Sequence, residues 1–191
     1  DTYTNILTYN ISWEIFTNNK WSSDASILLS SRKAIFNNIF DDTRYIFNLI
    51  SLQEVSFKDQ SSCNIIYDWD DINLFEYYPS VESMNKIKTR YNIIINKIKR
   101  SHNNCVASGM IILYDKNRFQ IEVLNNIPLV FNFNYQKKNG RPIQMVFFTC
   151  NLIYINVHAP HSQDYPSNLE ESIRQYITKY INSLNKPYGS Y

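Results

Sequence analysis

The sequence predicts an α/β or α+β fold, in which a layered sheet carries helices on its outer faces. Three observations lead to this prediction. A β-type segment, an amphipathic helical pattern and a buried apolar run follow one another in the first part of the chain. Several further β-type segments come after residue 105, and a second amphipathic helical pattern follows them. Strands and helices in this order favour sheets that are covered by helices.

The first half of the chain is predicted to contain two strands and two helices. Residues 5–11 alternate and are partly β-branched, which indicates a strand. Residues 25–40 have helical spacing, with Ser23 or Asp24 as the N-cap. Residues 45–53 form an almost continuous apolar run, typical of a strand buried on both faces. Residues 83–100, which are mixed and rich in Lys and Arg, are predicted to be helical.

The second half is predicted to be mostly β-structure, followed by one helix. Asp115–Asn117 and Cys150–Asn151 are expected to form hairpin turns. A helix is expected over residues 167–184, because Ser167 and Glu170 form a capping-box pattern ahead of an apolar face. The segments that read as strands are 106–114, 119–124, 129–133, 143–149 and 152–158.

Length and composition indicate an ordinary globular protein. The chain has 191 residues, of which 44% are apolar, and this suits a single domain over residues 1–191. The net charge is only +2, so any site for a polyanion must be local. There is no apolar run of about 18 residues, so no membrane span is expected.

Cysteine use and codon bias bear on the cellular setting. Cys63, Cys105 and Cys150 match no zinc or redox spacing, which indicates reduced thiols and an intracellular location, or small buried hydrophobes. Asn, Ile, Lys and Tyr are abundant, and their codons are AT-rich. This favours a parasite, a protist or a large DNA virus with an AT-rich genome, in which case the protein could also lie within a virion.

Asn10 and Glu54 lie at or just past the ends of predicted strands, where ligand-binding groups gather in layered sheets. Asn10 is either an outward-facing surface residue or a ligand for a hard metal or a phosphate. Glu54 ends the buried run. Burial of a carboxylate costs several kcal/mol unless the carboxylate is paired or bound to a metal. Glu54 is therefore either a strand-end residue that has already reached water, or a ligand for Mg²⁺ or Mn²⁺.

Arg141 and His158 are the candidate catalytic residues. His158 ends a predicted strand ahead of a loop that contains a second histidine, His161. A neutral imidazole there can act as a general base or donate to a phosphate oxygen, although a lone histidine is often structural. Arg141 is either an ordinary loop arginine or a residue that binds a phosphate through two parallel (bidentate) hydrogen bonds.

The basic stretch within residues 83–100 is the candidate substrate-binding surface. Nucleic acid is favoured as the partner, because a basic helix can follow a phosphate backbone. The alternative is a solvated basic helix face, which is how most charge runs are used. The residues assigned to this surface are Lys86, Lys88, Arg90 and Lys97.

Taken in order, these motifs resemble the endonuclease/exonuclease/phosphatase superfamily of deoxyribonuclease-I-like phosphoesterases. The motifs are a strand ending in Asn10, a buried strand ending in Gln53-Glu54, a Ser108-Gly109 strand, Arg141, and a strand closing on His158 before a helix. The resemblance covers nearly the whole chain. It implies a four-layer α/β-sandwich of two packed mixed β-sheets flanked by helices.

The resemblance also implies a function, namely that of an Mg²⁺- or Mn²⁺-dependent phosphodiesterase or phosphatase. A nuclease that hydrolyses phosphodiester bonds is favoured over an enzyme that acts on lipid or inositol phosphates. Glu54 would bind the metal, and Asn10 would help to hold the metal or the phosphate. His158 would contact the scissile phosphate or assist proton transfer, and Arg141 would contact the phosphate.

One family segment has no counterpart. The Gly-Asp-x-Asn motif that follows the histidine strand in this superfamily does not occur here. The chain is therefore expected to be the N-terminal two-thirds of the domain, with a longer native chain or a second chain completing the site. The competing hypothesis is a catalytically inactive structural or binding protein that is derived from this fold.

Overall fold

The structure is a computed structural model, and it describes residues 3–11, 13–16, 24–41, 46–58, 69–99, 106–134, 142–158 and 169–183. The chain forms two compact units, Asp1–Arg118 and Phe119–Tyr191. Each unit contains a sheet and at least one helix. Among the described residues, no helix is long and apolar enough to cross a membrane.

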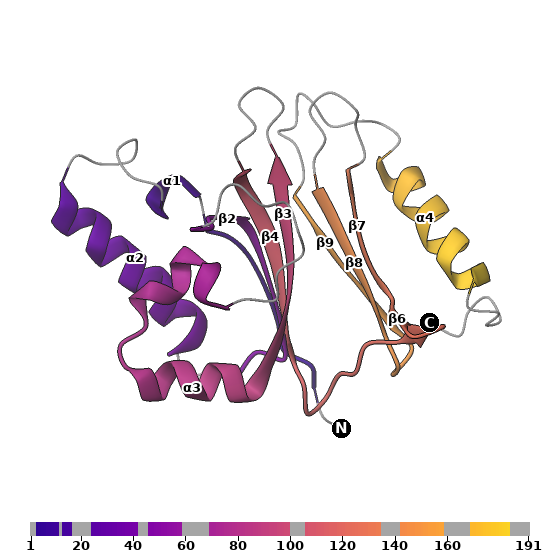
Figure 1. Cartoon of the computed structure of the whole chain (residues 1–191), viewed down its shortest axis with the longest axis horizontal. Coiled ribbons are helices and arrows are strands. Elements are labelled where there is room, and N and C mark those ends of the chain that lie inside the picture. Colours follow the sequence, from indigo (N-terminus) through magenta and orange to yellow (C-terminus); the bar gives the residue numbers. More distant parts are fainter. Residues whose placement is uncertain are drawn as a thin grey trace. The chain divides into compact units, whose positions relative to one another are not determined.

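The first unit is built on a mixed four-stranded sheet with the strand order β1-β2-β4-β3 (Figure 1). β1 and β2 run parallel, and the other neighbouring strands run antiparallel. Its elements are β1 (Ile6–Asn10), α1 (Trp13–Phe16), α2 (Ala25–Phe40), β2 (Leu49–Val55), the short 3₁₀ helices η1 (Trp69–Asp71) and η2 (Asn73–Tyr77), α3 (Val81–Arg90), β3 (Tyr91–Lys99) and β4 (Val106–Asp115).

Helices α1, α2 and α3 cover one face of this sheet (Figure 1). Phe36 of α2 is fully buried, and its ring centroid lies 5.1 Å from that of Phe40. The side chains of Ile50, Ile93 and Ile111 point from three strands into the same core. Burial of apolar surface between helices and sheet is therefore what holds the first unit together.

The helix predicted over residues 25–40 is confirmed with the same bounds. Asp24, one of the two expected caps, accepts hydrogen bonds from the backbone N–H groups of Ser26 and Ile27. It also accepts one from the Ser26 hydroxyl, at 2.7 Å. These bonds favour the carboxylate form and lower the pKa of Asp24, with the hydroxyl of Ser26 as the largest contributor.

The single helix predicted over residues 83–100 is wrong. α3 ends at Arg90, and the chain continues without a break into β3 (Tyr91–Lys99). Residues 93–95 are three consecutive isoleucines, whose β-branched side chains fit a pleated strand better than a helix. All of β3 pairs with the long strand β4, and this pairing overrides the helical preference of the flanking Lys and Arg residues.

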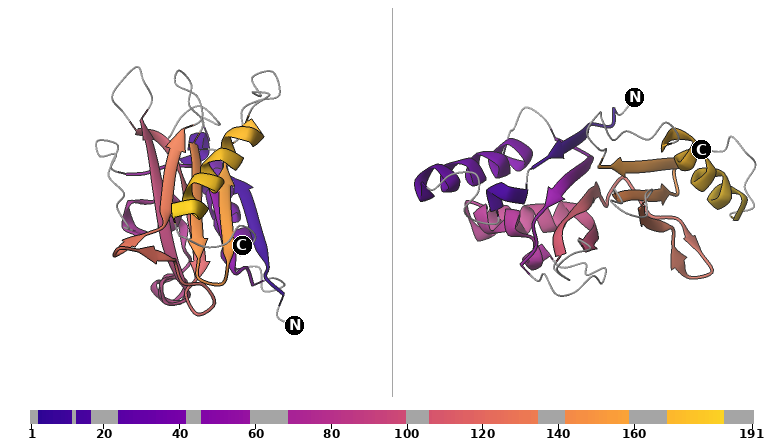
Figure 2. Two further views of the ribbon diagram at one scale, coloured as in Figure 1. Left: turned by 90° about the vertical axis from the view of Figure 1, so that its right-hand side faces the viewer. Right: turned by 90° about the horizontal axis from the view of Figure 1, so that it is seen from above.

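The second unit is a three-stranded antiparallel sheet with one covering helix. The strand order is β7-β8-β9, and α4 (Leu169–Ser183) lies across one face of the sheet (Figure 2). Met145 and Phe147 are buried there, and Tyr176 and Ile177 of the helix pack against this core. The strands of this sheet are β7 (Val130–Asn134), β8 (Pro142–Phe148) and β9 (Leu152–Val157), and a separate two-stranded sheet pairs β5 (Val123–Leu124) with β6 (Ile127–Pro128).

The predicted α/β (α+β) class is confirmed: the chain contains a mixed sheet, further sheets and helices. The second sheet differs from the mixed sheet expected, because its three described strands are all antiparallel. A short turn at residues 149–151 joins β8 to β9, and a connection of this length can only reverse the chain. The packing of the two sheets against each other, and a single domain over residues 1–191, stay predictions.

Substituting Phe36 tests the core of the first unit. Phe36→Ala removes a fully buried ring and leaves a cavity, which should lower the free energy of unfolding by about 3–5 kcal/mol. Ile27→Ala is the matched control on the same helix, because that side chain is 50% exposed. Its effect should stay within about 0.5 kcal/mol in urea unfolding. Equal losses in the two variants would contradict this assignment of the core.

Candidate functional site

Asn10 and Glu54 lie at the carboxyl ends of the two parallel strands. Asn10 is the last residue of β1, and its partner across the ladder is Gln53, the neighbour of Glu54. The backbone N–H of Ile11 donates to the Gln53 carbonyl oxygen at 3.1 Å, which extends the ladder past Asn10. Adjacent strands lie about 4.8 Å apart, so the structure brings these two predicted residues together.

A β-bulge sets the direction of Glu54. Leu52 is paired with Ile111 and Val55 with Gly109, so β2 has two residues where β4 has one. Leu52 and Val55 both belong to the core beneath the helices, although strict alternation would place Leu52 and Glu54 on one face. The bulge therefore gives Val55 the core position and leaves Glu54 half-buried outside it.

The backbone of Glu54 is in the left-handed region, with φ at 55°. The other non-glycine residues with positive φ in the described chain are asparagines, namely Asn125, Asn126 and Asn151. Asparagine tolerates this region, whereas for glutamate it costs about 1–2 kcal/mol. Strain of this kind, together with a bulge, gathers at functional sites. Glu54 is thus the most unusual backbone position in the part of the chain described.

The donor set at this edge fits a hard divalent cation. Asn10 is exposed and Glu54 is half-buried, and between them they offer an amide oxygen and a carboxylate. Mg²⁺ takes oxygen ligands and keeps several waters, so one carboxylate and one amide are chemically adequate. Within the described residues there is no group of three or more His, Cys, Asp or Glu side chains that could hold a metal. Metal binding by this pair therefore stays a prediction.

Gln53 and Thr8 belong to the same edge, although sequence reasoning did not assign them a role. The buried Gln53 side chain donates from Nε2 to the hydroxyl oxygen of Thr8 at 3.1 Å. This bond joins β1 to β2 through their side chains, next to Asn10 and Glu54. A glutamine directly before the glutamate was visible in the sequence, but its partner on another strand was not.

His158 follows β9 in the second unit and is half-buried. Its backbone N–H donates to the Pro142 carbonyl oxygen at 3.2 Å, which anchors the end of the strand. Two residues earlier, the buried Asn156 side chain donates to the amide oxygen of Gln144 at 3.5 Å. Both hydrogen bonds are made with residues of β8, and together they hold the end of β9 next to His158. Arg141 and His161 lie outside the described residues.

The lysines of α3 are paired with carboxylates. Lys86 lies 2.9 Å from Glu82, one helical turn earlier, and Lys88 lies 3.1 Å from Asp70. Both pairs are at least partly exposed, so each contributes little to stability and can be exchanged for another partner. The hydrogen bond from Lys86 lowers the pKa of Glu82. Around Lys86 and Lys88 the surface is thus locally balanced in charge.

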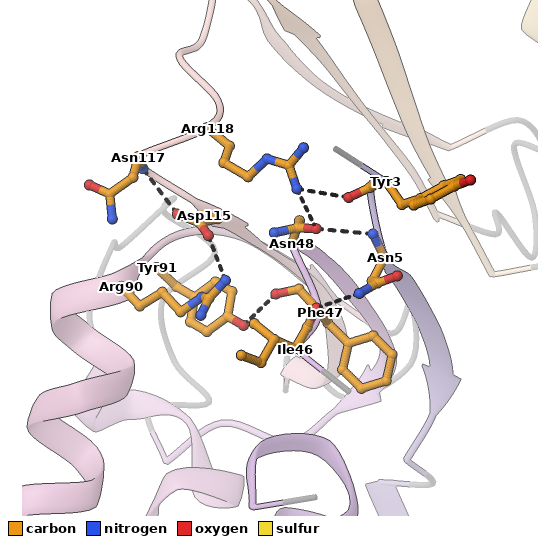
Figure 3. Close-up of polar contacts among 10 residues, drawn as sticks. All are labelled: Tyr3, Asn5, Ile46, Phe47, Asn48, Arg90, Tyr91, Asp115, Asn117 and Arg118. Carbon is orange, nitrogen blue, oxygen red and sulfur yellow. Dashed lines mark hydrogen bonds and ion pairs between the residues drawn. The ribbon is translucent and has the colours of Figure 1, made fainter. Parts of the chain in front are cut away.

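Arg90 lies at the opposite end of the sheet from Glu54. Figure 3 shows its guanidinium directed toward Asp115. Its Nη2 is 2.7 Å from the buried carboxylate of Asp115, and its guanidinium lies 5.4 Å from the centre of the Tyr91 ring. Asp115 is level with the start of β2, roughly 20 Å along the strand from Glu54 at about 3.3 Å per residue. Burial is the main cause that raises the pKa of Tyr91.

The same region ties the N-terminal segment to the sheet (Figure 3). The Asn48 side-chain oxygen accepts hydrogen bonds from the Asn5 backbone N–H at 3.0 Å and from Arg118 Nη1 at 2.9 Å. Arg118 Nη1 also donates to the Tyr3 carbonyl oxygen at 2.9 Å. The polar side chains around Arg90 therefore hold parts of the fold together, and Arg90 itself is engaged by Asp115.

Lys97 lies on β3 and not on a helix, and its side chain is 0% exposed. It forms an ion pair with Asp71 and lies 5.3 Å from the centre of the Phe57 ring. A buried, paired ammonium on the face beneath the helices is out of reach of a phosphate backbone at the surface. The expectation that Lys97 continues a basic helix face is therefore corrected by the strand pairing of β3.

The comparisons with known proteins support the fold. No protein-family model matches the sequence, and no curated protein matches it. A solved structure of an endonuclease/exonuclease/phosphatase family protein from Leptotrichia buccalis C-1013-b matches with a TM-score of 0.51 and 12% sequence identity. The match covers 92% of this chain and 61% of that chain. The chain thus has a fold similar to that of a protein from the superfamily it was expected to resemble.

Replacing Glu54 with glycine tests the strain at the bulge. Glycine adopts positive φ without steric cost, so Glu54→Gly should raise the free energy of unfolding by about 1 kcal/mol. Glu82→Gly in α3 is the matched control, because the same replacement in a helix should destabilise the protein. Thermal unfolding would reveal the opposite signs. A loss of stability in both variants would contradict the strained backbone.

Proposed function

We propose that this chain contributes Glu54, Asn10 and His158 to a divalent-metal-dependent phosphoesterase that hydrolyses phosphodiester bonds. The observation that carries the proposal is the bulge at the end of β2, which holds a strained glutamate beside Asn10 at the carboxyl ends of two parallel strands. The similarity to a superfamily structure supports the fold of such an enzyme. The matched structure is longer than this chain, so the activity of a whole enzyme is part of the proposal.

In this proposal Glu54 and Asn10 hold a Mg²⁺ or Mn²⁺ through oxygen atoms, and Gln53 braces the two strands through Thr8. When bound, the ion neutralises charge on the phosphate and on the leaving oxygen. On the resemblance alone, His158 of the second unit is assigned a hydrogen bond to a non-bridging phosphate oxygen, or the role of accepting a proton from the attacking water. The hydrogen bond from its backbone to Pro142 fixes the strand end from which the imidazole projects. Arg141 is assigned the phosphate clamp on the resemblance alone.

Glu54→Gln tests the metal site. It removes the charge while keeping the size of the side chain, so Mn²⁺ binding followed by electron paramagnetic resonance should be lost, together with hydrolysis of bis(p-nitrophenyl) phosphate by the native protein. His158→Ala should keep Mn²⁺ binding and lower the hydrolysis rate by about 10²- to 10⁴-fold. Glu82→Gln, at an exposed carboxylate on α3, serves as the control and should change neither.

The outcomes separate the two functional hypotheses. Mn²⁺ binding that survives Glu54→Gln would rule out this metal site. A wild-type native protein that binds Mn²⁺ through Glu54 but hydrolyses no phosphodiester would instead support the inactive structural or binding protein.

Nucleic acid as the substrate is tested by salt and by Lys86. Of the four basic residues predicted to bind substrate, Lys86 is the most exposed, so it can exchange Glu82 for a phosphate at low cost. Lys86→Ala should weaken binding of a DNA oligonucleotide and reduce the dependence of log affinity on log salt by about 1. Lys33→Ala, at an exposed position of α2, is the control. Salt-insensitive binding would remove nucleic acid as the substrate.

A further inference from the structure

The ion pair between Lys97 and Asp71 has no part in the proposed chemistry, yet it is a costly feature. The side chains of Lys97 and Asp71 are 0% and 9% exposed, respectively. Removing two charges from water is expensive, and a pair of apolar residues would often be more stable. We therefore consider which part of the backbone the pair of Lys97 and Asp71 holds in place.

The pair lies level with the bulge. Lys97 of β3 is paired with Gly109 of β4, and Gly109 is paired in turn with Val55, the first residue after Glu54. All three positions lie on one line across the sheet. Lys97 is on the face beneath the helices, the face to which Val55 of the bulge also contributes its side chain.

The chain that leaves the bulge is held by the segment that contains Asp71. The Lys58 N–H donates to the Asp71 carbonyl oxygen at 2.8 Å, and the Asn73 N–H donates to the Ser56 carbonyl oxygen at 3.1 Å. The Asn73 side chain also donates to the Ser56 hydroxyl at 2.6 Å. Because Asp71 is in turn bound to Lys97, these bonds tie the exit of the bulge to β3.

Gly109 makes room for this path. A Cβ at Gly109 would collide with the Asn96 carbonyl oxygen and would lie 2.5 Å from Cε2 of Phe57. The Phe57 ring therefore occupies the space above Gly109, and Lys97 lies against that ring. Any larger residue at position 109 would have to displace the backbone of β3 at Asn96 and the ring of Phe57, three residues after Glu54.

We infer that Lys97, through Asp71, and Gly109, through the space it leaves for Phe57, are positioning residues that hold the bulge and thereby the direction of Glu54. This inference rests on the proposed function for the role of Glu54 as a metal ligand. The contacts that hold the bulge are independent of that role.

The test uses two variants of the bulge support and one control. Lys97→Met combined with Asp71→Asn removes the pair without leaving one buried charge alone, and Gly109→Ala fills the space beneath Phe57. Leu113→Ala is the control, because Leu113 lies on the same strand and in the same core but is paired with Ile50, far from the bulge. The dissociation constant for Mn²⁺ should rise about 10- to 100-fold in the two bulge variants, the effect typical of residues that orient a ligand. In the control it should stay unchanged.

A second readout separates failure of this inference from failure of the proposed function. The HN–Hα coupling and the amide exchange of Glu54 and Val55, measured by nuclear magnetic resonance, report the backbone of the bulge without any metal. Loss of the left-handed conformation in the bulge variants, but not in Leu113→Ala, supports the inference even if the wild type does not bind Mn²⁺. An unchanged Glu54 backbone in both folded bulge variants, or the same change in the control, overturns it. If Gly109→Ala does not fold, the double variant Lys97→Met with Asp71→Asn tests the inference by itself.

Discussion

Strand β2 has hydrogen-bonding neighbours on both sides, parallel β1 and antiparallel β4, and its register therefore fixes the other elements of the first unit. A slip of one residue would move every side chain of the strand to the opposite face. The strand nevertheless contains one extra residue at its end, and the fold absorbs that residue in a single bulge. Both the apolar core and the position of Glu54 follow from where the bulge occurs.

Each end of this sheet carries an ion pair that includes at least one buried charge. At one end Lys97 pairs with Asp71, and at the other Arg90 pairs with Asp115. Neither pair is needed for burial of apolar surface, which the isoleucine-rich strands already provide. In a shifted register the buried Lys97 and Asp115 would lose their partners, so both pairs disfavour alternative strand alignments.

The sequence predicted regular elements well and the details of the bulge poorly. Helix α2 was predicted within its observed bounds, because capping and helical spacing are local signals that agree. Strand β3 was missed because its isoleucine run lies among Lys and Arg residues that favour a helix. The sequence predicted that Asn10 and Glu54 lie at strand ends, whereas the parallel pairing that brings the two ends together is seen only in the structure. The strain at Glu54 could not be predicted, because β2 itself has no glycine at the bulge and the residues that hold the bulge are distant in sequence.

The hydrogen bonds from Arg118 to the Tyr3 carbonyl and to Asn48 have a topological consequence. They bring the first described residue of this unit into direct contact with its last one, 115 positions later. A unit whose ends meet is suited to circular permutation. A short linker between these ends and a new opening in a surface connection would keep every strand neighbour of β2. The order of the elements along the chain is therefore separable from the arrangement that places Glu54.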